Sequence, residues 1–116
     1  MDQKMLIKNV PHENVFGLGS QIETGSGQIT SKTLAQNNAV SITLFAFDQN
    51  EEISTHHSEG DALVQVLEGT GLFTVAGAEY HVHAGECLIM PAGKPHAVYA
   101  EESFKMILTV VFPVRS

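Results

Sequence analysis

The stretch from Gly85 to His96 reads GECLIMPAGKPH. Gly85 suits a tight turn, and the apolar residues after it predict a short strand. Pro91 and Gly93 predict a second turn, because proline presets the backbone angle and glycine accepts a positive φ. His96 then opens the next strand. Turn, strand, turn and strand in close succession are typical of an antiparallel all-β protein.

The rest of the chain repeats this alternation. Clusters of turn-forming residues recur roughly every ten residues, with short runs rich in Val, Ile, Leu, Phe and Thr between them. No segment keeps a helical stripe of apolar residues over three turns. The spacing therefore predicts an antiparallel sandwich or barrel, and the length of 116 residues predicts one domain, residues 1–116.

The strands differ in their expected burial. One face of the strand predicted over residues 104–112 is apolar throughout: Phe104, Met106, Leu108, Val110 and Phe112. Residues 62–67 and 40–47 are apolar on nearly both faces, so their second side is expected to be covered by another sheet, a loop or another subunit. Gln65 is polar within such a run, and we expect it to hydrogen-bond across a dimer interface.

The N-terminal third is less regular. Met5 to Val10 predicts a strand at a sheet edge, which Pro11 ends. Residues 16–36 are richer in polar side chains and predict strand and loop without a finer assignment.

Composition excludes several classes of function. Thirteen acidic and six basic residues give a net charge of −7, which disfavours binding to nucleic acid and to anionic membranes. No run approaches the ~18 apolar residues of a membrane span. The single Cys87 cannot form an internal disulfide and is expected to be a small core residue. Residues 1–4 show no secretion signal, so we expect a cytoplasmic protein.

The histidines are the candidate functional residues, since five of the six lie between His56 and His96. The last of them completes a pattern in the opening stretch: Gly85, five residues, Pro91, one residue, Gly93, two residues and His96. This pattern resembles the second sequence motif of the cupin superfamily. The similarity extends over roughly residues 40–112.

The first cupin motif is matched only in part. Counted back from Gly69, His56 occupies the first histidine position of that motif. Ser58 stands at the second histidine position, Ala62 at the glutamate position and Asn50 at the opening glycine. Only His56 and His96 therefore keep the ligand role that the resemblance implies.

The resemblance implies an antiparallel double-sheet β-barrel of jelly-roll type, commonly a homodimer, with a small-molecule site inside the barrel. In many cupins three histidines and a carboxylate bind Fe, Mn, Ni, Cu or Zn at that site. Two imidazoles alone bind such a metal more weakly.

His57 is a possible third ligand. His57 and Asp61 reproduce the spacing between the second histidine and the acid, displaced by one residue. Because a one-residue displacement turns a strand side chain to the opposite face, only a bulge within residues 58–61 would turn them inward. Otherwise His57 is an exposed turn residue and Asp61 caps the following strand, and both alternatives stay open.

Other residues are weaker candidates. Tyr99, Met90 and Met106 are expected to contribute to the wall of a ligand site. His81 and His83 share a strand face, but Tyr80 and Val82 are expected to take the core side of that strand.

Two functions follow from these residues. In the first, His56 and His96, with His57, hold one divalent metal ion that acts on a small organic substrate. In the alternative, the barrel binds or senses a small molecule without metal, and the two histidines orient it. A third reading leaves the histidines without function in a filled barrel. Binding at either site should weaken below a pH of roughly 6.5, where histidines become charged. Whether a reaction is catalysed is not encoded in these motifs.

Overall fold

The computed structural model describes residues 5–114, so residues 1–4, the basis of the secretion prediction, lie outside the described part. The described chain forms two antiparallel sheets, as expected, and one short 3-10 turn, η1 (Leu18–Gln21). The strands are β1 (Ile29–Gln36), β2 (Val40–Phe47), β3 (Glu52–His56), β4 (Asp61–Glu68), β5 (Thr70–Val75), β6 (Ala78–His83), β7 (Cys87–Met90), β8 (His96–Tyr99) and β9 (Phe104–Val111). No helix within residues 5–114 has the length and apolarity needed to cross a membrane.

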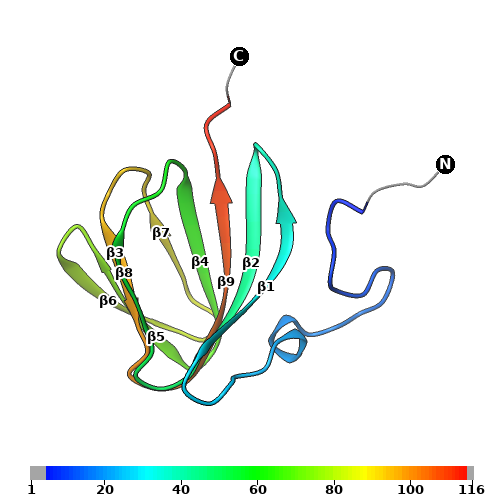
Figure 1. Ribbon diagram of the computed structural model, residues 1–116, viewed down its shortest axis with the longest axis horizontal. Helices are drawn as coiled ribbons and strands as arrows, with labels where there is room; N and C mark the ends of the chain where they lie inside the picture. The colour runs from blue at the N-terminus through cyan, green and yellow to red at the C-terminus, as the bar shows by residue number, and fades with distance from the viewer. Residues whose placement is uncertain (1–4, 115–116) are drawn as a thin grey trace.

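The sheets face each other across one core. The larger sheet has the order β1-β2-β9-β4-β7 and the smaller has the order β3-β8-β5-β6. Figure 1 shows them converging at the lower end and diverging at the upper end, where the C-terminal segment leaves β9. The barrel therefore has a closed and an open end.

Aromatic rings fill the closed end. Phe47 stacks on Phe104 with ring centroids 4.6 Å apart, and Phe73 meets Phe104 edge-on at 6.1 Å. All three side chains are fully buried. Gly71 admits these rings, because a Cβ there would collide with Phe104 and Phe73. This end is packed as a protein interior and leaves no room for a ligand.

The alternation predicted for β9 is confirmed. Phe104, Met106, Leu108 and Val110 all belong to or pack against the main core. In β4 the residues Ala62, Val64 and Val66 face the same core. The opposite face of β4 is not covered by the described chain at Leu63, which is 39% exposed.

The N-terminal segment covers another part of that outer face. Val10, Leu18 and Ile22 pack with Leu44 and Ala46 of β2 in a second apolar cluster. The strand predicted at residues 5–10 is wrong, because Asn9 adopts a left-handed φ of 68° that interrupts an extended chain. Two hydrogen bonds join this segment to β1: the Lys8 amide donates to the Leu34 carbonyl at 2.8 Å, and Asn9 Nδ2 donates to the Thr33 carbonyl at 2.7 Å.

The expectation of a buried Cys87 is also wrong. Cys87 is exposed, because alternate residues of β7 point to opposite faces and Met90 takes the core side. Cys87 and Ile89 thus share the outer face of an edge strand with Leu63 and Gln65 of β4, their neighbours in register.

Candidate functional site

His96 is placed by the turn that the sequence predicts. Gly93 has the expected positive φ, 78°, and the Lys94 amide closes the turn by donating to the Pro91 carbonyl at 3.3 Å. His96 follows as the first residue of β8 and is only 4% exposed. Its ring therefore faces the interior, as expected.

A bulge in β3 turns the His56 ring toward His96, while the His56 side chain stays exposed to the hollow. Ile53 lies opposite Val98, yet the next partners are His56 and His96, so Ser54 and Thr55 together span the position opposite Ala97. Ile53 packs on the core, and in a regular strand a residue three positions later would face the other side. The extra residue reverses this, so His56 faces the same side as Ile53.

The two imidazoles are in direct contact. Their ring centroids are 4.3 Å apart with an interplanar angle of 68°. The Nδ1 atom of His56 lies 3.0 Å from the Ser54 carbonyl, and the Nδ1 atom of His96 lies 3.2 Å from the Lys94 carbonyl. Because a carbonyl oxygen only accepts, each neutral ring carries its proton on Nδ1 and has a free lone pair on Nε2. The pair thus presents two hydrogen-bond acceptors.

Burial also keeps His96 neutral. Desolvation lowers the pKa of His96 below the ordinary 6.5, the hydrogen bond to the Lys94 carbonyl partly opposes this, and charge on His56 or His57 lowers the pKa further. Around neutral pH the buried ring is therefore uncharged.

The remaining donors do not complete a cupin metal centre. The Ser58 hydroxyl donates to the Gly60 carbonyl at 2.6 Å, and Ala62 places a buried methyl group where the carboxylate would be. Asp61 accepts a hydrogen bond from the Ala92 amide at 2.8 Å, and His57 is exposed after the end of β3. Within residues 5–114 no group of three or more His, Cys, Asp or Glu side chains could hold a metal ion. The donor set does not fit the three-histidine, one-carboxylate centre.

The loop between β3 and β4 is fastened to the turn that carries His96. Besides the Asp61 bond to Ala92, the Gly93 amide donates to the Ser58 carbonyl at 2.9 Å. Gly60 allows the close approach, since a Cβ there would run into the Val111 carbonyl. Ser58, at a ligand position of the family, and Asp61, one residue before another such position, therefore hold the two histidine-bearing segments together.

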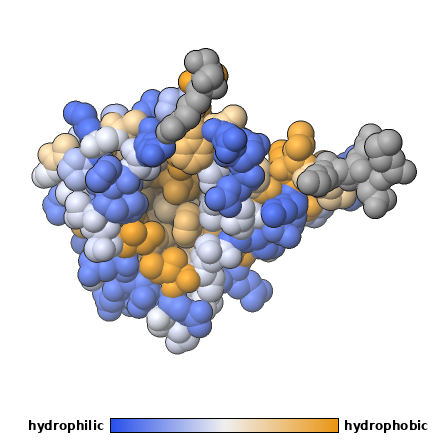
Figure 2. Space-filling view, turned by 45° about the horizontal axis from the view of Figure 1, so that its top comes forward, coloured by the Kyte–Doolittle hydropathy of each residue, from blue (hydrophilic) through white to orange (hydrophobic). Residues whose placement is uncertain are grey.

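A hollow opens beside the histidines. Phe45, Ile53, Leu108 and Val110 face the core yet remain partly exposed. Figure 2 shows the hollow at the open end, with apolar residues inside and hydrophilic residues around it. A cavity of about 640 Å³ lies at the rim, lined by residues that include Glu59 and Phe112. That volume is within the range of small-ligand sites.

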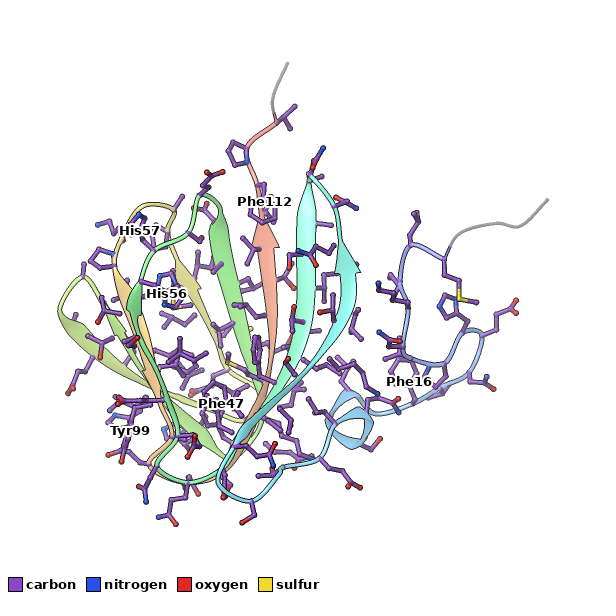
Figure 3. All side chains as sticks on the ribbon, viewed as in Figure 1. Phe16, Phe47, His56, His57, Tyr99 and Phe112 are labelled. Carbon is purple, nitrogen blue, oxygen red and sulfur yellow. The ribbon has the colours of Figure 1, made fainter. Side chains whose placement is uncertain are left out.

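The histidines lie below this rim. Neither of them lines the rim cavity. Figure 3 shows His56 in the space between the sheets, lower than Phe112, and His57 nearer the top. A ligand entering at the rim would therefore reach His56 from above.

Sequence reasoning missed the hydroxyls of β2. Ser41 and Thr43 alternate with Phe45 and Phe47, whose side chains pack in the core, so all four share the interior face. Ser41 and Thr43 are half-buried, and within the described residues neither hydroxyl has a side-chain hydrogen bond. The period-two pattern of residues 40–47 already contained this signal.

Tyr99 is not brought to the histidines. It alternates with the buried Val98, faces away from the core, and donates its hydroxyl to Asn50 Oδ1 at 3.0 Å. Figure 3 places it toward the opposite end of the molecule from His57. Met90 and Met106 are buried, beside Ala62 and Val66 respectively. They support the wall from within the core.

The side chains of the second histidine pair also face away from the core. His81 and His83 are exposed on β6, and Val82 is buried between them as expected. His81 Nε2 lies 2.8 Å from a Glu101 carboxylate oxygen, and His83 Nδ1 lies 2.9 Å from the Thr70 hydroxyl. Tyr80 is 44% exposed instead of buried, because β6 is an edge strand.

Comparison with known proteins identifies the family. A family model described as a cupin domain matches residues 43–112, which include both His56 and His96. The chain belongs to the cupin superfamily. None of the curated proteins compared matches this cupin significantly.

Several solved structures resemble this cupin closely. A conserved protein of unknown function from Streptococcus pyogenes is 38% identical, with a TM-score of 0.94 and coverage of 98% of this chain and 100% of its own. A cupin superfamily protein from Desulfitobacterium hafniense is 33% identical, with a TM-score of 0.88 and coverage of 92% and 98%. A cupin 2 conserved barrel domain protein from Leptotrichia buccalis is 41% identical, with a TM-score of 0.81 over 83% of this chain and 47% of its own.

Proposed function

We propose that this cupin binds a small organic molecule in the hollow between its sheets, with His56 and His96 as polar anchors and without a metal ion. The observation that carries the proposal is the pair of free Nε2 atoms on rings whose centroids are 4.3 Å apart. A mostly apolar cavity with a few converging polar groups is the usual form of a small-ligand site. Ser41 and Thr43 supply the facing hydroxyls.

The test is binding of small single-ring aromatic probes, followed by NMR through the side-chain resonances of His56, His96, Thr43 and Leu108. We expect at least one probe to shift these resonances together. The double variant His56→Ala, His96→Ala should lose the response, while His81→Ala, which changes an exposed histidine outside the hollow, should keep it. Shifts confined to residues outside the hollow would contradict the proposal.

A metal centre is the second candidate, favoured by the same adjacent Nε2 atoms. It would be one divalent ion, Fe, Mn, Ni, Cu or Zn, on His56 and His96, with His57 drawn in from the loop. Elemental analysis of protein purified without a histidine tag and then incubated with each metal tests it. Because the remaining donors are missing, we expect no stoichiometric metal. One ion per chain that the double histidine variant loses would favour this candidate instead.

We also propose that two copies associate through the outer face of β9, β4 and β7. Leu63, Ile89 and Val111 expose 39%, 60% and 57% of their surface there, with Gln65 between them. The eight residues of β9, the eight of β4 and the four of β7 cover roughly 300 Å² at ordinary strand spacing, less than half of the ~800 Å² per partner in a stable dimer. The exposed Met5, Leu6 and Val15 of the N-terminal segment would supply the rest.

Sedimentation of the wild-type chain should show a dimer at micromolar concentration. The variant Leu63→Lys, Ile89→Lys should be monomeric, because it places charges in the contact. Val114→Lys is the matched control, since Val114 is 97% exposed at the rim, away from this face. A wild-type monomer, or a charged-face variant that remains dimeric, would contradict the interface.

A further inference from the structure

We infer that the ligand of the hollow is uncharged, with an apolar body and a hydroxyl group that donates its hydrogen bond to Nε2 of His56 or of His96. This inference rests on the proposed function, because it assigns a chemical class to the ligand of the same site. It follows from the proton positions on the two rings and from the absence of charged side chains on the interior strand faces below the rim.

The two histidines require a hydrogen-bond donor on the ligand. With both Nδ1 protons directed at the carbonyls of Ser54 and Lys94, the neutral rings offer only lone pairs at Nε2. A ligand group with a hydrogen to donate satisfies such an atom. A carboxylate or phosphate oxygen would instead face two lone pairs and be repelled.

Glu59 lines the cavity at the rim, but the strand faces below the rim exclude charge of either sign. Among the described residues, the interior faces of β2, β3, β8 and β9 carry Ser, Thr, His and apolar side chains but no Lys, Arg, Asp or Glu. Lys105 faces outward, where its ammonium group donates to the Gly19 carbonyl at 2.8 Å, and the Asp61 carboxylate is bound to the Ala92 amide. A buried ligand charge without a counter-charge is strongly unfavourable.

The facing hydroxyls complete the recognition. Ser41 and Thr43 lie on the interior face of β2, and a hydroxyl both donates and accepts. A ligand hydroxyl that donates to an imidazole keeps lone pairs that Thr43 or Ser41 can satisfy. Phe45, Ile53 and Leu108 offer the apolar surface for the rest of the molecule.

Four probes with one benzene ring separate these requirements: benzyl alcohol, toluene, benzoate and benzylamine. Each is titrated into the wild-type protein at pH 8, above the ordinary histidine pKa of about 6.5, and followed by the resonances of the hollow. Benzyl alcohol should bind best. Toluene, which lacks the hydroxyl, should bind about three- to tenfold more weakly, the effect of one hydrogen bond. Benzoate should not bind measurably.

Variants check the contacts. Thr43→Val removes a hydroxyl at nearly constant shape, and His56→Ala removes an acceptor. Each should weaken benzyl alcohol severalfold while leaving toluene within about twofold, whereas His81→Ala should change neither. Variants that weaken benzyl alcohol and toluene equally would overturn the inference, because the loss would then come from packing.

The outcomes also distinguish a wrong ligand class from a wrong binding function. Benzoate or benzylamine binding as tightly as benzyl alcohol would overturn the assignment of an uncharged donor and leave the binding function intact. If no probe shifts the resonances of the hollow up to its solubility limit, the proposed function fails and the inference fails with it.

Discussion

Two backbone carbonyls determine which nitrogen carries the proton in each of the two site histidines. Ser54 and Lys94 each accept from a histidine two residues further along the chain, at 3.0 and 3.2 Å. These contacts orient the rings and select the protonated nitrogen, as outer partners of functional histidines generally do. These contacts arise where the backbone is irregular. A bulge precedes His56 and a turn precedes His96, and each brings the carbonyl group close to the histidine two residues later. The irregularities are therefore part of the site.

The pKa of His96 gives a test at this level. Burial, the largest cause, and the charges of His56 and His57 lower it. An imidazole NMR titration should place the pKa of His96 below 6.5. It should rise in His57→Ala without reaching that value, because burial remains. A pKa of His96 at or above 6.5 in the wild type would contradict the buried, neutral ring.

The lowered pKa of His96 also predicts how stability depends on pH. Because the folded protein binds this proton less readily than the unfolded chain, the free energy of unfolding is unaffected well above pH 6.5 and falls as pH drops through and below it. His96→Phe removes this titration and should show a shallower loss of stability between pH 7 and pH 5, measured by urea unfolding. If the free energy of unfolding falls with pH in parallel for the wild type and His96→Phe, the link between His96 and pH-dependent stability is contradicted.

Strands and loops act on the site through their connections. The bulge in β3 turns His56 inward, and the bonds from Ala92 and Gly93 to Asp61 and Ser58 hold the two loops together. The Ser58 carbonyl and the Asp61 carboxylate are both occupied by these hydrogen bonds. Ser58, at a ligand position of other cupins, has here a structural role.

Asp61→Ala should therefore weaken binding indirectly. It removes the acceptor of the Ala92 amide, which should lower the free energy of unfolding by about 1 kcal/mol and weaken benzyl alcohol severalfold. Asp61→Asn keeps an acceptor oxygen and should retain most of both. Equal losses in the two variants would indicate that the carboxylate charge matters and that the hydrogen bond does not.

Across the molecule, the dense aromatic core and the proposed binding site lie at opposite ends. The closed end holds the stacked Phe47, Phe104 and Phe73, and the open end holds the histidines, the hydroxyls and the partly exposed apolar wall. A jelly roll permits this division, because its sheets can diverge at one end while a dense core anchors the other.

A pair of substitutions tests this division. Phe104→Leu loses two ring contacts and should lower the free energy of unfolding by about 2 kcal/mol, with benzyl alcohol affinity unchanged. Thr43→Val should do the reverse, leaving urea stability nearly constant and weakening the probe. Joint losses of stability and affinity in both variants would show that the two ends are coupled.

Much of this arrangement is encoded locally in the chain. The turns at Gly85 and Gly93 and the alternation of β9 depend on intrinsic backbone preferences and on a period of two, so they are readable without coordinates. The meeting of His56 and His96 was likewise expected from the cupin spacing. The bulge at Ser54 and Thr55, the outward turn of Cys87 and the irregular path of residues 5–10 were not. Those features depend on which strand pairs across the sheet and in what register, and such long-range contacts form only when distant segments pack together.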